Sequence, residues 1–163
     1  MTIAVGDRLP DAQLLAFDAD KGPHSVDLSS LTAGKRIVLF GLPGAFTRTC
    51  TAAHVPSFIR TKDGFAEKGI DTIVCVAVND PFVMKAWAES TGAEEAGLHM
   101  LADGNGALAK AMGLDFTAPP VGFHGRFKRF AMIVDDSVVQ VLDVEDSPGE
   151  CSISGGEALL EKA

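Results

Sequence analysis

The sequence predicts an α/β fold in which a central mixed β-sheet is flanked by helices. Two stretches, 36–41 and 71–78, are apolar on consecutive residues, which is typical of strands buried on both faces of a sheet. The first is followed by apolar residues at helical spacing, and the second by a helix-start signal at 79–81. Two later apolar runs flank Asp135 and Asp136, and this pattern predicts an antiparallel hairpin. Parallel and antiparallel strands should therefore share one sheet.

Turn and helix signals predict the remaining elements. Turn-forming residues at 18–23 separate the first two strands. Thr47 or Thr49 can cap the first long helix, and Pro56 inside it predicts a kink. We expect a long loop through 118–125. The expected strands are 13–17, 24–28, 36–41, 71–78, 98–102, 129–134 and 137–144, and the expected helices are 49–68, 81–90, 107–112 and 155–162.

Length and composition narrow the class of protein. This order of elements is typical of a thioredoxin-like fold, and 163 residues fit a single domain covering 1–163. The net charge of -8 argues against nucleic acid or an anionic membrane as a partner. No signal peptide or membrane span is expected. Three widely spaced cysteines do not resemble a secreted disulfide framework, so we expect a cytoplasmic protein.

The stretch from Pro43 to Cys50 carries the chemistry. Cys50 falls between a strand and a helix, where free backbone N–H groups and the helix dipole favour a thiolate. A thiolate can attack a disulfide, an acyl group or a peroxide. Thr47 stands where a Cys-x-x-Cys oxidoreductase has its first cysteine, which argues against a disulfide reductase. The alternative is a buried, inert cysteine beside a capping threonine.

The spacing Pro43-x-x-x-Thr47-x-x-Cys50 resembles the peroxiredoxin signature. The longer resemblance is to the type II, or peroxiredoxin five, subfamily, and it runs from Val5 to Ser152. It departs from the family at Arg48, where proline or glycine is frequent. The segments that carry this resemblance are 40–47, 54–58, 76–83, 101–103 and 128–132.

The resemblance implies a thiol peroxidase that reduces hydrogen peroxide and small alkyl hydroperoxides. Cys50 corresponds to the peroxidatic cysteine, which becomes a sulfenic acid. Thr47 corresponds to the residue that aligns thiolate and peroxide, Pro43 to the shielding proline, and Arg129 to the arginine that stabilises the negative charge. The family uses thioredoxin, glutaredoxin or glutathione as reductant and commonly forms homodimers. No cofactor and no metal is expected.

Two cysteines are candidates for resolving the sulfenic acid. Cys151 lies in an expected loop and matches the resolving cysteine of atypical two-cysteine members, and we favour it. Cys75 lies within an apolar strand, where a buried inert thiol is expected, yet it resembles a cysteine of the plant enzymes. An external thiol is the third possibility.

Several residues near the motif have two interpretations. His54, four residues after Cys50, could act as a base or metal ligand, but we expect a structural, hydrogen-bonded histidine. Arg126 and Lys128 are expected to be surface charges. The main alternative to a peroxidase is a redox sensor that passes its oxidation to a partner protein. A cysteine hydrolase using Cys50 and His54 lacks an orienting third group.

Overall fold

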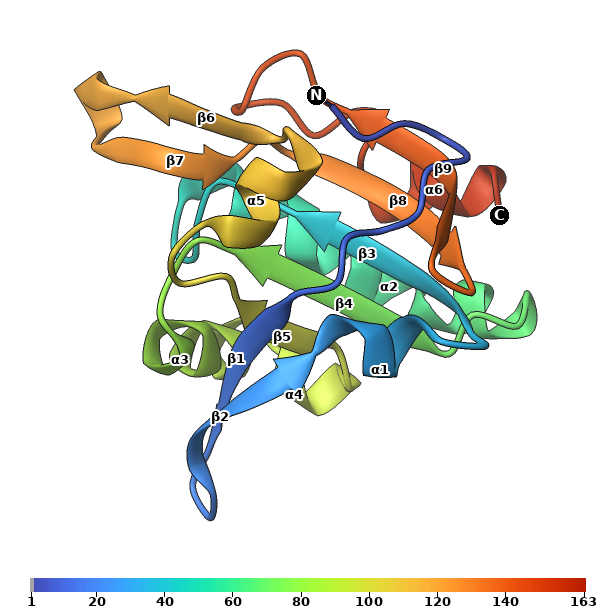
Figure 1. Cartoon of the computed structure of the whole chain (residues 1–163), viewed down its shortest axis with the longest axis horizontal. Coiled ribbons are helices and arrows are strands. Elements are labelled where there is room, and N and C mark those ends of the chain that lie inside the picture. Colours follow the sequence, from blue (N-terminus) through green and yellow to red (C-terminus); the bar gives the residue numbers. More distant parts are fainter. Residues whose placement is uncertain (1) are drawn as a thin grey trace.

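The computed structural model describes residues 2–163 and contains one large and one small β-sheet (Figure 1). The large sheet has seven strands in the order β2-β1-β5-β4-β3-β8-β9, and the small sheet pairs β6 with β7. The strands are β1 Gln13–Asp18, β2 Gly22–Asp27, β3 Arg36–Gly41, β4 Thr72–Ala77, β5 His99–Ala102, β6 Asp115–Ala118, β7 Phe123–Phe127, β8 Phe130–Asp135 and β9 Val138–Val144.

The large sheet is mixed, as the sequence predicts. Its centre is parallel, because β4 pairs with β3 on one side and β5 on the other. The flanking pairs, β1 with β2 and β5, and β8 with β3 and β9, are antiparallel. The two fully apolar stretches form the two central strands, which helices cover on both faces. The predicted thioredoxin-like α/β fold with a central mixed sheet is confirmed.

Helices and hydrophobic cores lie on both faces of the sheet. Alternate residues of β3 point to opposite sides, so Val38 and Phe40 join one core while Ile37 and Leu39 join the other. The helices are α1 Leu28–Thr32, α2 Val55–Glu67, α3 Pro81–Thr91, α4 Ala93–Ala96, α5 Ala107–Met112 and α6 Gly156–Glu161. Helices α2, α3 and α6 pack on the first core, and α5 packs on the second, in front of the sheet in Figure 1. Among residues 2–163, no helix has the length and apolar character needed to cross a membrane.

The expected loop through 118–125 is wrong. Strands β6 and β7 pair there as an antiparallel hairpin, which extends beyond the large sheet at the upper left of Figure 1. Pro119 and Pro120 suggest a loop, but they occupy only the short 3-10 turn Pro119–Val121 at the hairpin tip. A proline lacks the N–H that a ladder needs, yet a turn between strands does not require it. The hairpin therefore positions the residues that lead into β8.

The helix around Cys50 begins in an irregular way. A π-helical turn, Cys50–His54, precedes α2, and the N–H of Val55 donates to the carbonyl of Cys50. Pro56 lies in the first turn of α2, where its missing N–H is tolerated. The predicted caps are wrong, because the Thr49 side chain makes no capping bond. The Thr47 and Thr49 hydroxyls donate instead to loop carbonyl groups. Wide turns of this kind are frequent at functional sites.

Candidate active site

The loop after β3 brings Cys50 to a buried position at the carboxyl end of the strand. The strand ends at Gly41, and the chain turns into the helix through Phe46, which has a left-handed backbone with φ of 63°. Cys50 is fully buried and packs in the core that α2 and α3 share. The sulfur is therefore shielded from bulk water, and its chemistry depends on the few polar groups that reach it.

The first of these groups is the guanidinium of Arg129, which follows β7 and precedes β8. It is 1% exposed, and its Nη2 lies 3.1 Å from Cys50 Sγ. Nε and Nη2 also donate to the carbonyl of Pro148 at 3.3 and 3.0 Å. No carboxylate among residues 2–163 forms an ion pair with this guanidinium. A buried cation needs a negative partner, and a Cys50 thiolate supplies one.

His54 holds the other side of the guanidinium. Its Nε2 lies 3.0 Å from the carbonyl oxygen of Ser154, and its Nδ1 lies 2.9 Å from Arg129 Nη1. A carbonyl only accepts, so Nε2 carries the proton and Nδ1 accepts from the arginine. Burial and the charge of Arg129 lower the pKa of His54 to about 3. The structural, hydrogen-bonded histidine that we expected is confirmed.

Pro43 and Thr47 line one pocket together with Arg129. The Thr47 hydroxyl donates to the carbonyl of Gly44 at 2.7 Å, which leaves its oxygen lone pairs available to accept. Pro43 is buried beside it. Arg48 is exposed at this pocket. The remaining residues of the lining are Thr49, Val121, Phe123, Pro148 and Gly149.

The segment after β9 lies against this site and carries Cys151. Three of its carbonyl groups accept hydrogen bonds from the site: that of Pro148 from Arg129, that of Gly149 from Thr49, and that of Ser154 from His54. Cys151 is half-buried, and burial raises the pKa of its thiol. Cys75 is fully buried in β4, and burial raises the pKa of its thiol well above the usual range. All three cysteines are free.

Glu145 anchors that segment, and sequence reasoning missed it. Its Oε2 accepts from the backbone N–H groups of Ser152, Ile153 and Ser154 at 2.9, 2.9 and 2.7 Å, and from the Ser154 hydroxyl at 2.6 Å. Burial raises the pKa of this carboxyl, but the bonds from Ser154 and Ser152 outweigh it and hold the pKa below its usual value. An acidic residue at the end of a strand is common, so only the fold reveals this role.

Two expectations about basic residues have different outcomes. Lys128 is exposed, as expected. Arg126 is not a free surface charge, because it is half-buried and its Nη1 donates to the carbonyl of Pro43 at 2.8 Å. Strand alternation gives no signal for this contact, because a period of two would place Arg126 on the same side of β7 as the exposed His124.

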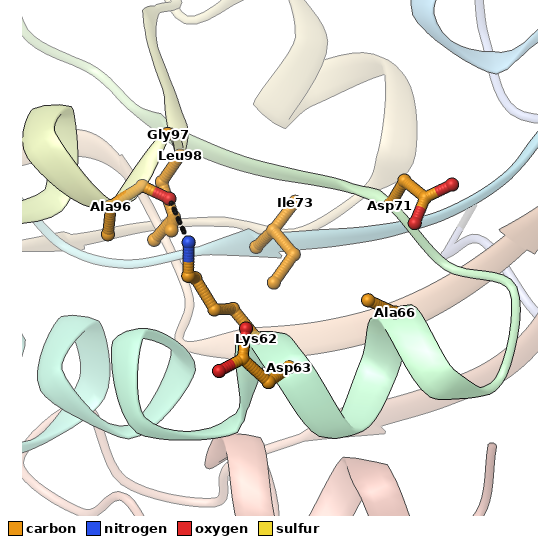
Figure 2. Close-up of a pocket in the computed structure, with 8 residues that line it drawn as sticks. All are labelled: Lys62, Asp63, Ala66, Asp71, Ile73, Ala96, Gly97 and Leu98. Carbon is orange, nitrogen blue, oxygen red and sulfur yellow. Dashed lines mark hydrogen bonds between the residues drawn. The ribbon is translucent and has the colours of Figure 1, made fainter.

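A second hollow, shown in Figure 2, lies between α2, α4 and the start of β4. Its lysine, Lys62, donates to the carbonyl of Ala96 at 3.0 Å, at the end of α4. That bond satisfies a helix carbonyl, so the cation has a structural role. Across residues 2–163, no three His, Cys, Asp or Glu side chains converge as metal ligands. The hollow is lined by Lys62, Asp63, Ala66, Asp71, Ile73, Ala96, Gly97 and Leu98.

Comparison with known proteins places this site in a wider group. Residues 4–160 match the family model described as Redoxin. The chain is 47% identical over 163 residues to Peroxiredoxin-2E-2, chloroplastic, of Oryza sativa subsp. japonica, covering 98% of this chain and 72% of that protein. It is 46% identical over 159 residues to Peroxiredoxin-2C of the same organism, covering 98% and 97%. It superposes with a TM-score of 0.90 on reduced Prx3 in complex with H2O2 from Vibrio vulnificus, at 44% identity and 99% coverage of both chains.

Proposed function

The chain belongs to the redoxin family as a type II peroxiredoxin, a thiol peroxidase, and from this we propose that it reduces hydrogen peroxide and small alkyl hydroperoxides at Cys50. One observation carries the proposal: the buried Arg129 guanidinium donates to the Cys50 sulfur at 3.1 Å, beside a pocket that the Thr47 hydroxyl lines. A thiolate, a cation and a hydroxyl acceptor together suit a small, polar O–O bond.

In the first step the Cys50 thiolate attacks the terminal oxygen of the hydroperoxide. An S–O bond forms as the O–O bond breaks, the sulfur is oxidised to a sulfenic acid, and the departing RO⁻ takes a proton from water. Arg129 stabilises the negative charge as it passes from sulfur to the leaving oxygen. Thr47 accepts a hydrogen bond from the peroxide O–H and so orients it, and Pro43 shields the loop from water.

In the second step Cys151 resolves the sulfenic acid. Its thiol attacks the Cys50 sulfur, the S–S bond forms, and the sulfenic oxygen leaves as water. The loop position of Cys151 and the contacts of its segment with Arg129 and His54 support this choice. Cys75 remains the other internal candidate, but full burial within β4 disfavours its attack.

The catalytic cycle closes when an external thiol reduces the disulfide. Thioredoxin, glutaredoxin or glutathione supplies two electrons and is itself oxidised to a disulfide. We further propose that residues 1–163 form a single domain, that two copies associate as a homodimer, and that the protein acts in the cytoplasm without nucleic acid or membrane partners.

A stopped-flow measurement tests the peroxidase directly. Reduced protein mixed with hydrogen peroxide should form a sulfenic acid at Cys50 in a second-order reaction, and Cys50→Ser should abolish it. Steady-state consumption of peroxide with thioredoxin or glutaredoxin should then follow. Absence of the fast oxidation would refute the peroxidase. Fast oxidation without turnover by any of the three reductants would instead favour the alternative, a redox sensor that oxidises a partner protein.

A further inference from the structure

We propose that Arg126 is a positioning residue of the peroxidase reaction, which fixes the backbone turn that orients Thr47. This inference rests on the proposed role of Thr47 in aligning the peroxide. Arg126 reaches from β7 to the loop after β3, where its Nη1 donates to the carbonyl of Pro43 at 2.8 Å. Its guanidinium carbon also lies 5.1 Å from the centre of the Phe123 ring, within reach of a cation–π interaction. The Arg126 side chain therefore packs on a residue of its own strand, β7, and at the same time donates a hydrogen bond to the loop after β3.

Gly44 leaves the space that the Arg126 guanidinium occupies. A side-chain Cβ at position 44 would overlap Arg126 Nη1, so the guanidinium lies directly against a bare backbone. Gly44 does not have a left-handed backbone, so its lack of a side chain is explained by this close approach. A second hydrogen bond fixes the same loop, because the N–H of Ala45 donates to Oδ1 of Asn79, which follows β4, at 2.9 Å. Two peptide groups of the turn therefore have fixed orientations.

The consequence reaches the pocket through Gly44. The carbonyl of Gly44 accepts from the Thr47 hydroxyl at 2.7 Å and from the Thr47 N–H at 3.4 Å. Because the hydroxyl donates there, its lone pairs point elsewhere and can accept from a peroxide. The Gly44 carbonyl belongs to the next peptide, between Gly44 and Ala45, which Asn79 holds. Tilting the peptide between Pro43 and Gly44 would move Gly44, shift this acceptor and rotate the hydroxyl. Together with Asn79, Arg126 thereby sets the direction of the Thr47 lone pairs without touching Cys50.

This role differs from that of Arg129, and the difference can be measured. Arg129 donates to the sulfur itself, so its loss affects every reaction of the Cys50 thiolate. Arg126 acts on the alignment of the peroxide. The rate of reaction of Cys50 with a reagent that needs no such alignment should therefore not depend on Arg126. Iodoacetamide is such a reagent, because it reports thiolate reactivity without an O–O bond to orient.

The experiment compares Arg126→Ala, Arg126→Lys and the exposed control Lys128→Ala in the full chain. We expect Arg126→Ala to lower the second-order rate of Cys50 oxidation by hydrogen peroxide about tenfold, with alkylation by iodoacetamide within about twofold of wild type. Arg126→Lys, which keeps one donor and the charge but loses the planar fork, should fall between. Lys128→Ala should match wild type in both reactions.

A double variant separates positioning from general damage to the fold. In a Thr47→Val background, Arg126→Ala should change the peroxide rate less than about threefold, because the hydroxyl that Arg126 orients is gone. Equal losses in both backgrounds would overturn the inference, as would a parallel loss of peroxide and iodoacetamide reactivity. If Arg126→Ala does not fold, the same comparison is made with Arg126→Lys, and wild-type kinetics there would also overturn it. A wild-type chain inert to peroxide would refute the peroxidase itself, a distinct result.

Discussion

Arg129 and His54 form a buried pair in which the histidine accepts and the arginine donates, at 2.9 Å between Nη1 and Nδ1. Both side chains are almost inaccessible to solvent, at 1% and 0% exposed. The pairing requires a neutral imidazole, and the carbonyl of Ser154 selects the tautomer by accepting from Nε2. The orientation of the guanidinium toward Cys50 thus depends on a proton held on the far side of the histidine ring.

This pairing predicts a loss of stability in mild acid. The folded-state pKa of His54 is about 3, below its ordinary value of 6.5, so in this window the unfolded chain binds a proton that the folded chain excludes. The neutral His54 makes its full contribution to the free energy of unfolding above pH 6.5, and this contribution is lost as the pH falls toward 3. Between pH 6.5 and 5, the free energy of unfolding should drop by about 1.5 kcal/mol, as measured by urea denaturation.

The matched variants for this prediction are His54→Asn and His124→Gln. Asparagine does not titrate, and its amide oxygen can still accept from Arg129, so the pH dependence between 6.5 and 5 should flatten. His124 is exposed, and its replacement should leave the wild-type slope unchanged. A wild-type slope in His54→Asn would contradict the assignment.

The Thr47 hydroxyl should matter for peroxide more than for any other electrophile. Thr47→Val keeps the volume but removes the acceptor, so oxidation of Cys50 by hydrogen peroxide should slow by about a hundredfold. Thr47→Ser keeps the hydroxyl and should stay within a few-fold of wild type. Stopped-flow kinetics give both rates, with iodoacetamide alkylation as the reference reaction. A valine variant as fast as the serine variant would contradict the role of the hydroxyl.

Cys151 and Cys75 should behave differently when replaced by serine. Cys151→Ser should stop turnover with thioredoxin and leave a sulfenic acid on Cys50, because the half-buried loop thiol is the accessible one. Cys75→Ser should turn over like wild type, since its thiol lies fully buried in β4. Mass spectrometry of peroxide-treated protein without reductant identifies the disulfide. A Cys50–Cys75 bond, or wild-type turnover by Cys151→Ser, would contradict this assignment.

Glu145 should control how readily the segment with Cys151 opens. Glu145→Gln loses the charge that accepts three backbone N–H groups, and should cost about 2 kcal/mol of unfolding free energy. Hydrogen exchange of the Ser152 and Ser154 amides should accelerate, and so should conversion of the sulfenic acid to the disulfide. The exposed carboxylate Glu150, in the same segment, provides the control Glu150→Gln. Identical amide exchange rates in Glu145→Gln and Glu150→Gln would contradict the proposed role of Glu145 in holding this segment.

Much of the fold follows from the sequence because its signals are local. The consecutive apolar residues of β3 and β4 predict two buried central strands, and a turn at Asp135 and Asp136 predicts the hairpin of β8 and β9. The turn itself lies one residue later, at Asp136 and Ser137, which both have positive φ as a two-residue hairpin turn requires. The hairpin of β6 and β7 was missed, because two adjacent prolines outweigh a short alternating pattern.

The reactive motif is likewise local, and its partners are not. Pro43, Thr47 and Cys50 lie within eight residues, so their spacing alone predicts a thiolate with a hydroxyl beside it. Family resemblance adds Arg129, and the tertiary structure puts its guanidinium on the sulfur. The roles of His54 and Glu145 depend on hydrogen bonds to Ser154, which lies 100 residues from the histidine. Such bonds exist only after the chain has folded, since their direction is set by packing between distant segments and leaves no periodic trace in the sequence.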